Sequence, residues 1–205
     1  QQLAALAAAG VRDVALLSDG MVLGIAESLS QWRERGMHVA AFSDRAAAAE
    51  WAKDYALLLL LANNVFATPA TLVHAAEYQK PTLFVRDAAT SDDRHARIDL
   101  NDRWTGIAVL PSAYLNQLPD LAEDWSLQSA LLRHAVQNNV ARETMAIGPA
   151  APLQSEIIVD LADVDRWQSG AMASHFDAEA ATATPLRRWL SLPLARMVLP
   201  HLCTG

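Results

Sequence analysis

The residues best suited to bind a ligand stand directly after the most apolar stretches of the chain. Polar residues follow three of these stretches, at Ser18–Gly20, Asn63–Asn64 and Arg86–Asp87. If the stretches are strands of a parallel sheet, these residues mark the carboxyl ends, where ligands of open α/β sheets bind. We therefore expect one ligand site, with the candidate residues Ser18, Asp19, Gly20, Asn63, Asn64, Thr68, Thr71, His74, Arg86 and Asp87.

Two groups of candidates also fit structural roles. Ser18–Gly20 could offer backbone N–H groups to a phosphate at the start of the next helix, or form a turn with a capping aspartate. This triplet lacks the glycine spacing of a dinucleotide fingerprint and the Gly-Lys-Ser/Thr of a P-loop. His74 either faces the ligand edge or is a structural histidine, because a fold easily accommodates an imidazole without a function.

The sequence contains no complete set of catalytic or metal-binding residues. Its six histidines are scattered, no two of them are spaced i, i+4 as in a metal site, and no Gly-x-Ser-x-Gly elbow occurs. The single cysteine, Cys203, excludes an internal disulfide and a cysteine-based metal site. We therefore expect no metal and no cofactor, and we assign no catalytic residue.

The stretch Tyr55–Asp87 shows which elements would position these residues. An apolar run reaches Ala62, a helical pattern follows Thr-Pro-Ala-Thr (Thr68–Thr71), and a second apolar run occupies Thr82–Val85. Both runs are apolar throughout rather than alternating, which is typical of strands covered on both faces. The stretch therefore predicts strand, loop, helix and strand in a parallel sheet between helices.

The same alternation continues through most of the chain. Gly10 and Gly36 close helical patterns, and Ser43 or Asp44 can cap a helix. The expected strands are Val14–Leu17, Met37–Phe42, Tyr55–Leu61, Thr82–Val85 and Ile107–Leu110, and the expected helices are Gln2–Ala9, Val22–Arg35, Arg45–Lys53, Pro69–Gln79, Tyr114–Leu118 and Leu127–Asn138. Right-handed crossovers then give an α/β fold, a three-layer Rossmann/flavodoxin-like parallel sheet of about five strands with helices on both faces, plus a C-terminal extension.

We expect the chain to divide at its most linker-like stretch, residues 148–152 (GPAAP). Residues 1–147 then form the Rossmann-like domain, and residues 148–205 form an extension that packs on it. The extension is expected to hold a short strand at Glu156–Leu161 and a last helix at Leu186–Val198. The mixed-charge segment Asp87–Thr105 is either a solvated loop or surface helix, or a loop over the ligand site.

Composition excludes several classes of partner. The 205 residues are 52% hydrophobic and 19% charged, enough for a sizeable core, and the net charge of -7 argues against a nucleic-acid polymer as partner. No apolar stretch reaches the roughly 18 residues of a membrane helix, so no membrane insertion is expected. A single cysteine and no basic segment before an apolar one at the N-terminus fit a cytoplasmic protein. The chain does not begin with methionine, which fits a fragment or a processed product.

The layout from Ser43 to Pro111 resembles the C-terminal, donor-binding half of two-domain (GT-B) glycosyltransferases. The resemblance rests on FSDRAAAAEWAKDYALLLLLANN, ATPATLVHAAEYQKPTLFVRD and DDRHARIDLNDRWTGIAVLP. Thr71-Leu72 and Lys80-Pro81 match pairs that recur in that family, while His74 stands at the place of its ribose-binding glutamate and Gln79 at that of a glycine. The resemblance implies a nucleotide-sugar donor site at this position.

A second stretch, Val14–Leu118, resembles response-regulator receiver domains, and GIAVLPSAYLNQLPDL resembles their last strand and loop. Asn63 or Asn64 stands where that family has its phosphoacceptor aspartate, Leu110 where it has a lysine, and Asp19 alone stands for the acidic pair. The resemblance therefore implies a degenerate receiver that is not phosphorylated in the usual way and acts by binding a partner.

Two functional hypotheses follow. The first is a non-catalytic or degenerate Rossmann-like regulatory module of pseudo-receiver type, acting through a protein partner or as a homodimer by means of the apolar segment Leu186–Leu202. The alternative is a nucleotide or nucleotide-sugar binding domain that resembles a glycosyltransferase donor half, with the nucleotide near the candidate residues above.

Overall fold

The computed structural model describes residues 2–17, 25–91, 93–118, 126–145, 155–157 and 163. The chain divides into two units, Gln1–Ile157 and Ile158–Gly205. The elements below all belong to the first unit. The predicted linker at 148–152 and the predicted helix Leu186–Val198 lie outside the described residues, so the domain boundary at residue 148 stays a prediction.

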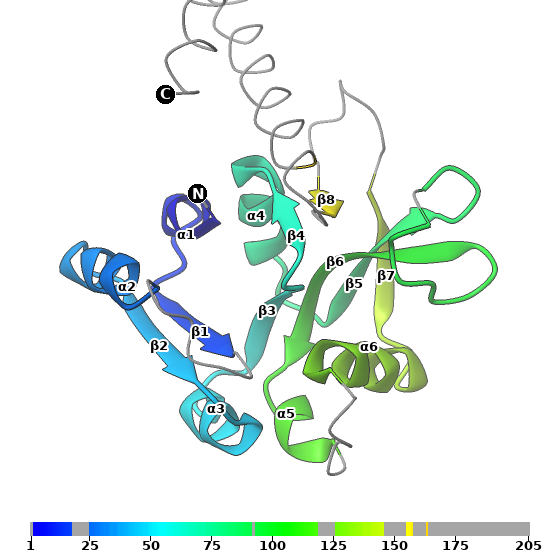
Figure 1. Cartoon of the computed structure of the whole chain (residues 1–205). Helices are drawn as coiled ribbons and strands as arrows, with labels where there is room; N and C mark the ends of the chain where they lie inside the picture. The colour runs from blue at the N-terminus through cyan, green and yellow to red at the C-terminus, as the bar shows by residue number, and fades with distance from the viewer. Residues whose placement is uncertain are drawn as a thin grey trace, which may run out of the picture. The chain divides into compact units, whose positions relative to one another are not determined.

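The described elements alternate between helix and strand over the first half of the first unit, as the sequence predicts (Figure 1). In chain order they are α1 (Gln2–Ala8), β1 (Asp13–Leu17), α2 (Ile25–Glu34), β2 (His38–Phe42), α3 (Arg45–Ala52), β3 (Leu57–Leu61), β4 (Val65–Ala67), α4 (Pro69–Ala76), β5 (Thr82–Asp87), β6 (Asp102–Pro111), α5 (Tyr114–Gln117), α6 (Leu127–Gln137), β7 (Ala141–Thr144) and β8 (Ser155–Ile157).

Local chemistry explains several of the helix boundaries. The side chain of Asp44 accepts a hydrogen bond of 2.8 Å from the backbone N–H of Ala47, so it caps α3 as predicted. Thr68 caps α4 in the same way, and Pro69 occupies the first helical position, where its missing N–H has no consequence. Gly10 follows α1 with a positive φ of 81°, a conformation that glycine adopts without strain.

The α/β class is confirmed, but the strands form three sheets rather than one parallel sheet. β1 and β2 pair in parallel, β4 and β8 pair antiparallel, and the largest sheet has the order β3-β6-β5-β7. In that sheet β5 and β7 are parallel, whereas β6 runs antiparallel to both of its neighbours. The reason is that a parallel partner needs a crossover connection, usually a helix, and the described residues between β5 and β6 (88–91 and 93–101) form no helix.

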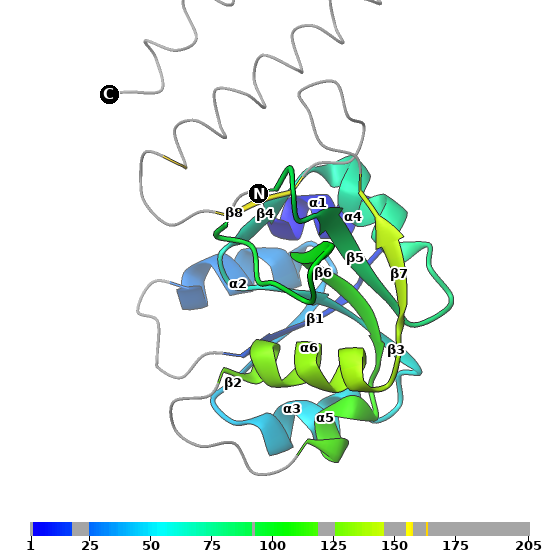
Figure 2. The same ribbon diagram turned by 90° about the vertical axis from the view of Figure 1, so that its right-hand side faces the viewer.

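The core is built on both faces of the β3-β6-β5-β7 sheet. Every residue from Trp104 to Leu110 is buried. Because successive side chains of a strand point to opposite faces of the sheet, both faces are buried here. In Figures 1 and 2, α4 and α6 lie on opposite sides of this sheet. Both helices turn apolar side chains inward: α4 buries Leu72 and Ala75, and α6 buries Ala130, Leu131, Leu132 and Ala135. Both faces are therefore covered, as the unbroken apolar runs predict.

Gly106 lets β4 pass close to β6. Its φ is +85°, and a Cβ built on it would stand 2.3 Å from Cγ2 of Val65. The pairing of β5 with β6 shifts register around Phe84, so β6 bulges at this point. Thr105 Oγ1 donates a hydrogen bond of 2.9 Å to the Phe84 carbonyl there and holds the two strands together across the irregular pairing.

Candidate functional site

The topology places two of the predicted polar groups at one edge of the main sheet. β3 and β5 both run antiparallel to β6, so they share a direction, and β7 runs parallel to β5. Asn63–Asn64 follow the carboxyl end of β3, and Arg86–Asp87 form that of β5. The third group, Ser18–Gly20, lies outside the described residues, so its part in the site stays a prediction.

Asn63 and Asn64 form an exposed turn between β3 and β4. The backbone N–H of Asn63 donates to Oε1 of Gln128 at 3.2 Å, which ties the turn to the first residues of α6. Asn side chains combine one acceptor oxygen with an amide that donates two hydrogen bonds. The turn therefore presents two adjacent amide groups to solvent at the carboxyl edge of the sheet.

Thr68 and Thr71 have structural roles at the start of α4. Their hydroxyl oxygens lie 2.8 Å apart, and the Thr68 hydroxyl also accepts from the Thr71 N–H at 3.4 Å. The side chain of Thr71 is buried, with 1% of the residue exposed. These two residues fix where the helix begins and leave little of Thr71 for a ligand to reach.

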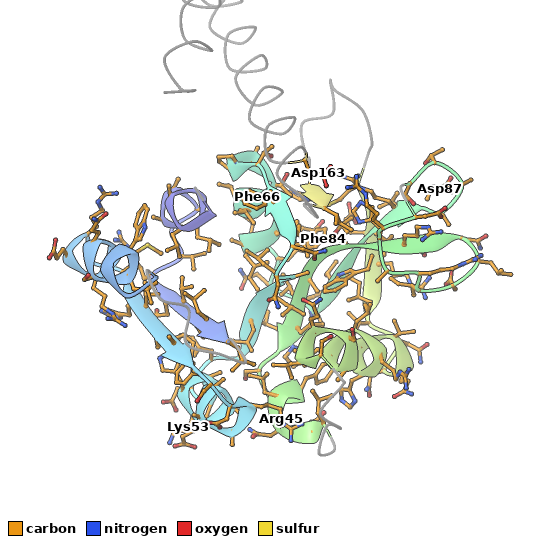
Figure 3. All side chains as sticks on the ribbon, viewed as in Figure 1. Arg45, Lys53, Phe66, Phe84, Asp87 and Asp163 are labelled. Carbon is orange, nitrogen blue, oxygen red and sulfur yellow. The ribbon has the colours of Figure 1, made fainter. Side chains whose placement is uncertain are left out.

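Arg86 and Asp87 both contact the protein main chain. Arg86 Nη2 donates to the carbonyl oxygen of Ser155 and lies 3.4 Å from its Oγ. Asp87 Oδ1 accepts from the N–H of Ala89 at 2.8 Å, so the carboxylate shapes the turn that follows β5. Figure 3 shows Asp87 at the start of this loop. Asp87 remains exposed.

His74 lies at the other end of the same sheet. It lines an open groove of about 400 Å³ together with Glu77, Tyr78, Gln79, Lys80, Thr82 and Ala141. Thr82 and Ala141 are the first residues of β5 and β7, so the groove is at the amino edge of these strands. The structure therefore separates His74 from the Asn63–Asn64 turn.

The groove is framed by an aromatic cluster. The imidazole of His74 meets the rings of Tyr78 and Phe84 edge-on, at centroid distances of 5.2 and 6.1 Å. Burial raises the pKa of the Tyr78 hydroxyl above its ordinary value, and the nearby Glu143 carboxylate raises it further. His74 thus has the packing of a structural histidine, the second of the two roles that the sequence allows.

The charged segment after β5 is a loop only as far as residue 101, because Asp102–Thr105 belong to β6. His95 is 3% exposed and its Nδ1 lies 3.1 Å from the Trp104 carbonyl. Arg103 donates to the His95 carbonyl at 2.9 Å and pairs with Asp93. The loop is therefore tied to its own strand at several points.

Arg142 of β7 fastens the far end of this loop by pairing with Asp99 and Asp102. The hydrogen bond from Arg142, and then the N–H groups of Asn101 and Asp102, lower the pKa of Asp99 from 3.8 to about 2. A lowered folded-state pKa means that the carboxylate stabilises the fold at pH values above its unfolded pKa, and that this contribution is lost as the pH falls through about 2.

We expect Asp99→Asn to lower the urea midpoint at pH 7 by a small amount and to lower it less at pH 2, where Asp99 is protonated in the unfolded state and about half protonated in the folded state. The measurement is urea unfolding of both proteins at the two pH values. Arg142→Gln is the matched control, since it removes the same pair from the other side, and the double variant should lose no more than the larger single loss. An equal midpoint at pH 7 would show that the pair contributes nothing.

Sequence reasoning missed Gln128, Thr105 and Ser155, which support the turn and Arg86. Thr105 and Ser155 are fully buried polar residues, and no motif or period marks either of them. Their partners are 21 and 69 residues away in the chain, so only the folded structure shows the contacts. Among the described residues, no group of three or more His, Cys, Asp or Glu side chains could hold a metal ion. Within the same residues, no helix has the length and apolar character to span a membrane.

The fold is similar to that of two solved proteins that transfer nucleotides. One, from Bacillus anthracis, is described as a glucose-1-phosphate thymidylyltransferase in complex with sucrose; it has a TM-score of 0.51 and 10% identity, over 79% of this chain and 77% of that one. The other is the inositol-1-phosphate CTP transferase from T. maritima, with a TM-score of 0.51 and 15% identity, over 78% and 77%. No family model and no curated protein matches the sequence.

The hypothesis of a non-catalytic pseudo-receiver module is wrong. The fold is similar to the folds of the two nucleotide-transferring proteins named above, which favours the nucleotide-binding alternative. The sheet itself explains the error, because receiver domains have a parallel doubly wound sheet, whereas here the antiparallel β6 stands between β3 and β5. The apolar runs in the sequence cannot distinguish a parallel sheet from this mixed sheet, since a strand that is buried on both faces is apolar throughout whatever its direction.

Proposed function

We propose that the first unit binds a nucleotide or a nucleotide-sugar at the carboxyl edge of β3 and β5. The observation that carries this proposal is the fold shared with a thymidylyltransferase and a CTP transferase over more than three quarters of this chain. Both names describe proteins that act on nucleotides. The proposal concerns binding and assigns no transfer step to this chain.

The geometry of the edge supports this position. Ligands of open α/β sheets bind outside the carboxyl ends of the strands, and the exposed turn of Asn63 and Asn64 stands there. Two neighbouring amides suit the hydroxyls of a ribose and the polar edge of a base, because each amide both donates and accepts. Thr68, Thr71 and Asp87 then act indirectly, by fixing the start of α4 and the turn after β5.

We expect CTP, dTTP or a nucleotide-sugar derived from them to raise the thermal midpoint of the chain measurably at millimolar concentration. A ligand at 100 times its Kd stabilises the folded state by about 2.7 kcal/mol. Replacing both Asn63 and Asn64 by alanine should raise the Kd by about fivefold or more, through the loss of one or more net hydrogen bonds. Calorimetric titration, with and without Mg²⁺, measures the Kd.

Asn116→Ala is the matched control for this experiment. Asn116 is an exposed amide on α5, which follows the carboxyl end of β6 and so lies at the opposite edge of the sheet. Its replacement should leave the Kd unchanged. A panel of all common nucleoside triphosphates and their sugar conjugates that gives neither heat nor a thermal shift would refute the proposed function. Binding that is indifferent to the double variant would place the ligand elsewhere.

A further inference from the structure

β8, a strand of three residues, reaches the proposed site from far along the chain. Ser155 pairs with Ala67 and Ile157 pairs with Val65, so β8 runs along the whole of β4. β4 in turn joins the Asn63–Asn64 turn to the Thr68 cap of α4. The main chain on one side of the proposed site is therefore held by a strand that lies about ninety residues away in sequence.

Side-chain contacts hold β8 in place. Two strands of three residues form a weak pair by themselves, so other interactions must fix β8 on β4. Ser155 is fully buried and Ile157 is 7% exposed. The Ser155 Oγ lies 3.5 Å from the carbonyl oxygen of Thr105, whose own hydroxyl donates to the Phe84 carbonyl. A chain of buried polar groups thus links β8 through β6 to β5.

Arg86 completes this link from the end of β5. Its guanidinium donates to the carbonyl oxygen of Ser155, and a charged donor makes a stronger hydrogen bond than a neutral one. The guanidinium and the Ser155 hydroxyl are also 3.4 Å apart. The sequence suggests Arg86 as a ligand-binding cation, but in the structure its Nη2 is directed at the main chain of β8.

We infer that Arg86 is a positioning residue, which docks β8 on β4 and thereby sets the conformation of the Asn63–Asn64 turn. This inference deepens the proposed function, because it assigns Arg86 an indirect part in the same site.

The test compares Arg86→Gln and Arg86→Lys with unchanged protein in the full-length chain. Hydrogen–deuterium exchange without any ligand should rise by about tenfold at residues 63–67 and 155–157 in Arg86→Gln, as one charge-assisted hydrogen bond is lost. Arg86→Lys keeps the positive charge but offers its N–H donors from one nitrogen instead of a planar guanidinium. The rise in exchange at the same residues should therefore be smaller. Exchange in α6 and β2 should stay unchanged in both variants.

A second variant separates positioning from direct contact. Ile157→Ala loosens β8 at a residue that is 7% exposed and pairs with Val65, so it should raise the Kd for CTP or dTTP in the same direction as Arg86→Gln. In the double variant, the increase in Kd should be smaller than the product of the two single increases, because both substitutions act through one strand. Arg142→Gln is the control, since Arg142 pairs with Asp99 and Asp102 and does not touch β8.

Two results would overturn the inference. In the first, Arg86→Gln weakens nucleotide binding and flattens its salt dependence while exchange at residues 63–67 and 155–157 stays as it was, which makes Arg86 a direct phosphate ligand. In the second, exchange rises evenly over the whole sheet, which makes Arg86 a general stability residue. If no nucleotide binds at all, the proposed function fails, and the exchange pattern alone still decides whether Arg86 positions the turn.

Discussion

Replacing Gly106 by alanine is expected to lower the free energy of unfolding by about 3 kcal/mol, from the combined cost of a positive φ and of overpacking. The backbone part arises because φ is +85°, where an L side chain is strained. The steric part arises because the new Cβ would stand 2.3 Å from Val65 Cγ2 and 3.3 Å from Ala62 Cβ. Urea unfolding of the two proteins measures the difference.

Gly36→Ala separates the two parts of this cost. Gly36 has almost the same φ, +84°, but an added Cβ there meets nothing within 4 Å. Its replacement should therefore cost only about 1–2 kcal/mol, the backbone part. The double variant Gly106→Ala/Val65→Ala should lose less unfolding free energy than the sum of the two single losses, since it removes the Val65 Cγ2 methyl group that clashes with the new Cβ. If Gly106→Ala loses no more unfolding free energy than Gly36→Ala, then β4 moves away from the new methyl group without a measurable loss of stability.

The Gly106 variant also bears on the proposed site. Val65 follows the Asn63–Asn64 turn directly, so a side chain that pushes Val65 away displaces the turn as well. We therefore expect any nucleotide affinity of the chain to fall in Gly106→Ala and to remain in Gly36→Ala. This comparison does not depend on a residue that touches the ligand.

Phe84→Ala is expected to have the largest effect on stability, a loss of about 4 kcal/mol, which lies within the range for truncating a buried aromatic residue. Phe84 is 1% exposed and is among the largest fully buried side chains of the described residues. It meets Tyr78 edge-on at a centroid distance of 5.1 Å and also contacts His74. Figure 3 labels Phe84 beside the β3-β6-β5-β7 sheet.

Leu100→Ala is the control for the core variant. Leu100 is 81% exposed, so its truncation should change the unfolding free energy by less than about 0.5 kcal/mol. Phe84→Leu, which keeps much of the volume, should lose clearly less than Phe84→Ala. Urea unfolding, followed by near-ultraviolet circular dichroism, measures the unfolding free energy of all three variants. A loss below about 1 kcal/mol in Phe84→Ala would mean that the neighbouring side chains collapse into the space.

Local chemistry made some elements predictable. The cap at Asp44, the proline at the first turn of α4 and the glycine after α1 each act within a few residues, so the sequence places α3, α4 and α1 to within a few residues. The apolar runs that became β3 and β5 were equally legible, because strands buried on both faces need uninterrupted apolar residues.

Elements held by distant partners were harder to predict. β7 has the sequence ARET, four exposed residues with no apolar period, and it is a strand because β5 offers it a parallel partner. β4 is three residues long and was expected to be loop, since its partner β8 begins 88 residues after it ends. The predicted strand at Glu156–Leu161 overlaps β8, but the sequence gives no sign of where such a strand pairs.

For the candidate site, the sequence by itself determined which residues follow the strands, since chain order and apolar runs suffice to name Asn63–Asn64 and Arg86–Asp87. Only the tertiary structure decided what these residues do. In the structure Arg86 donates a hydrogen bond to the main chain of β8, and Thr71 is buried at the start of α4. His74 lies at the opposite edge of the sheet. The physical reason is that a side chain's partners depend on strand direction and on pairing between distant segments, which residue type and local spacing do not encode.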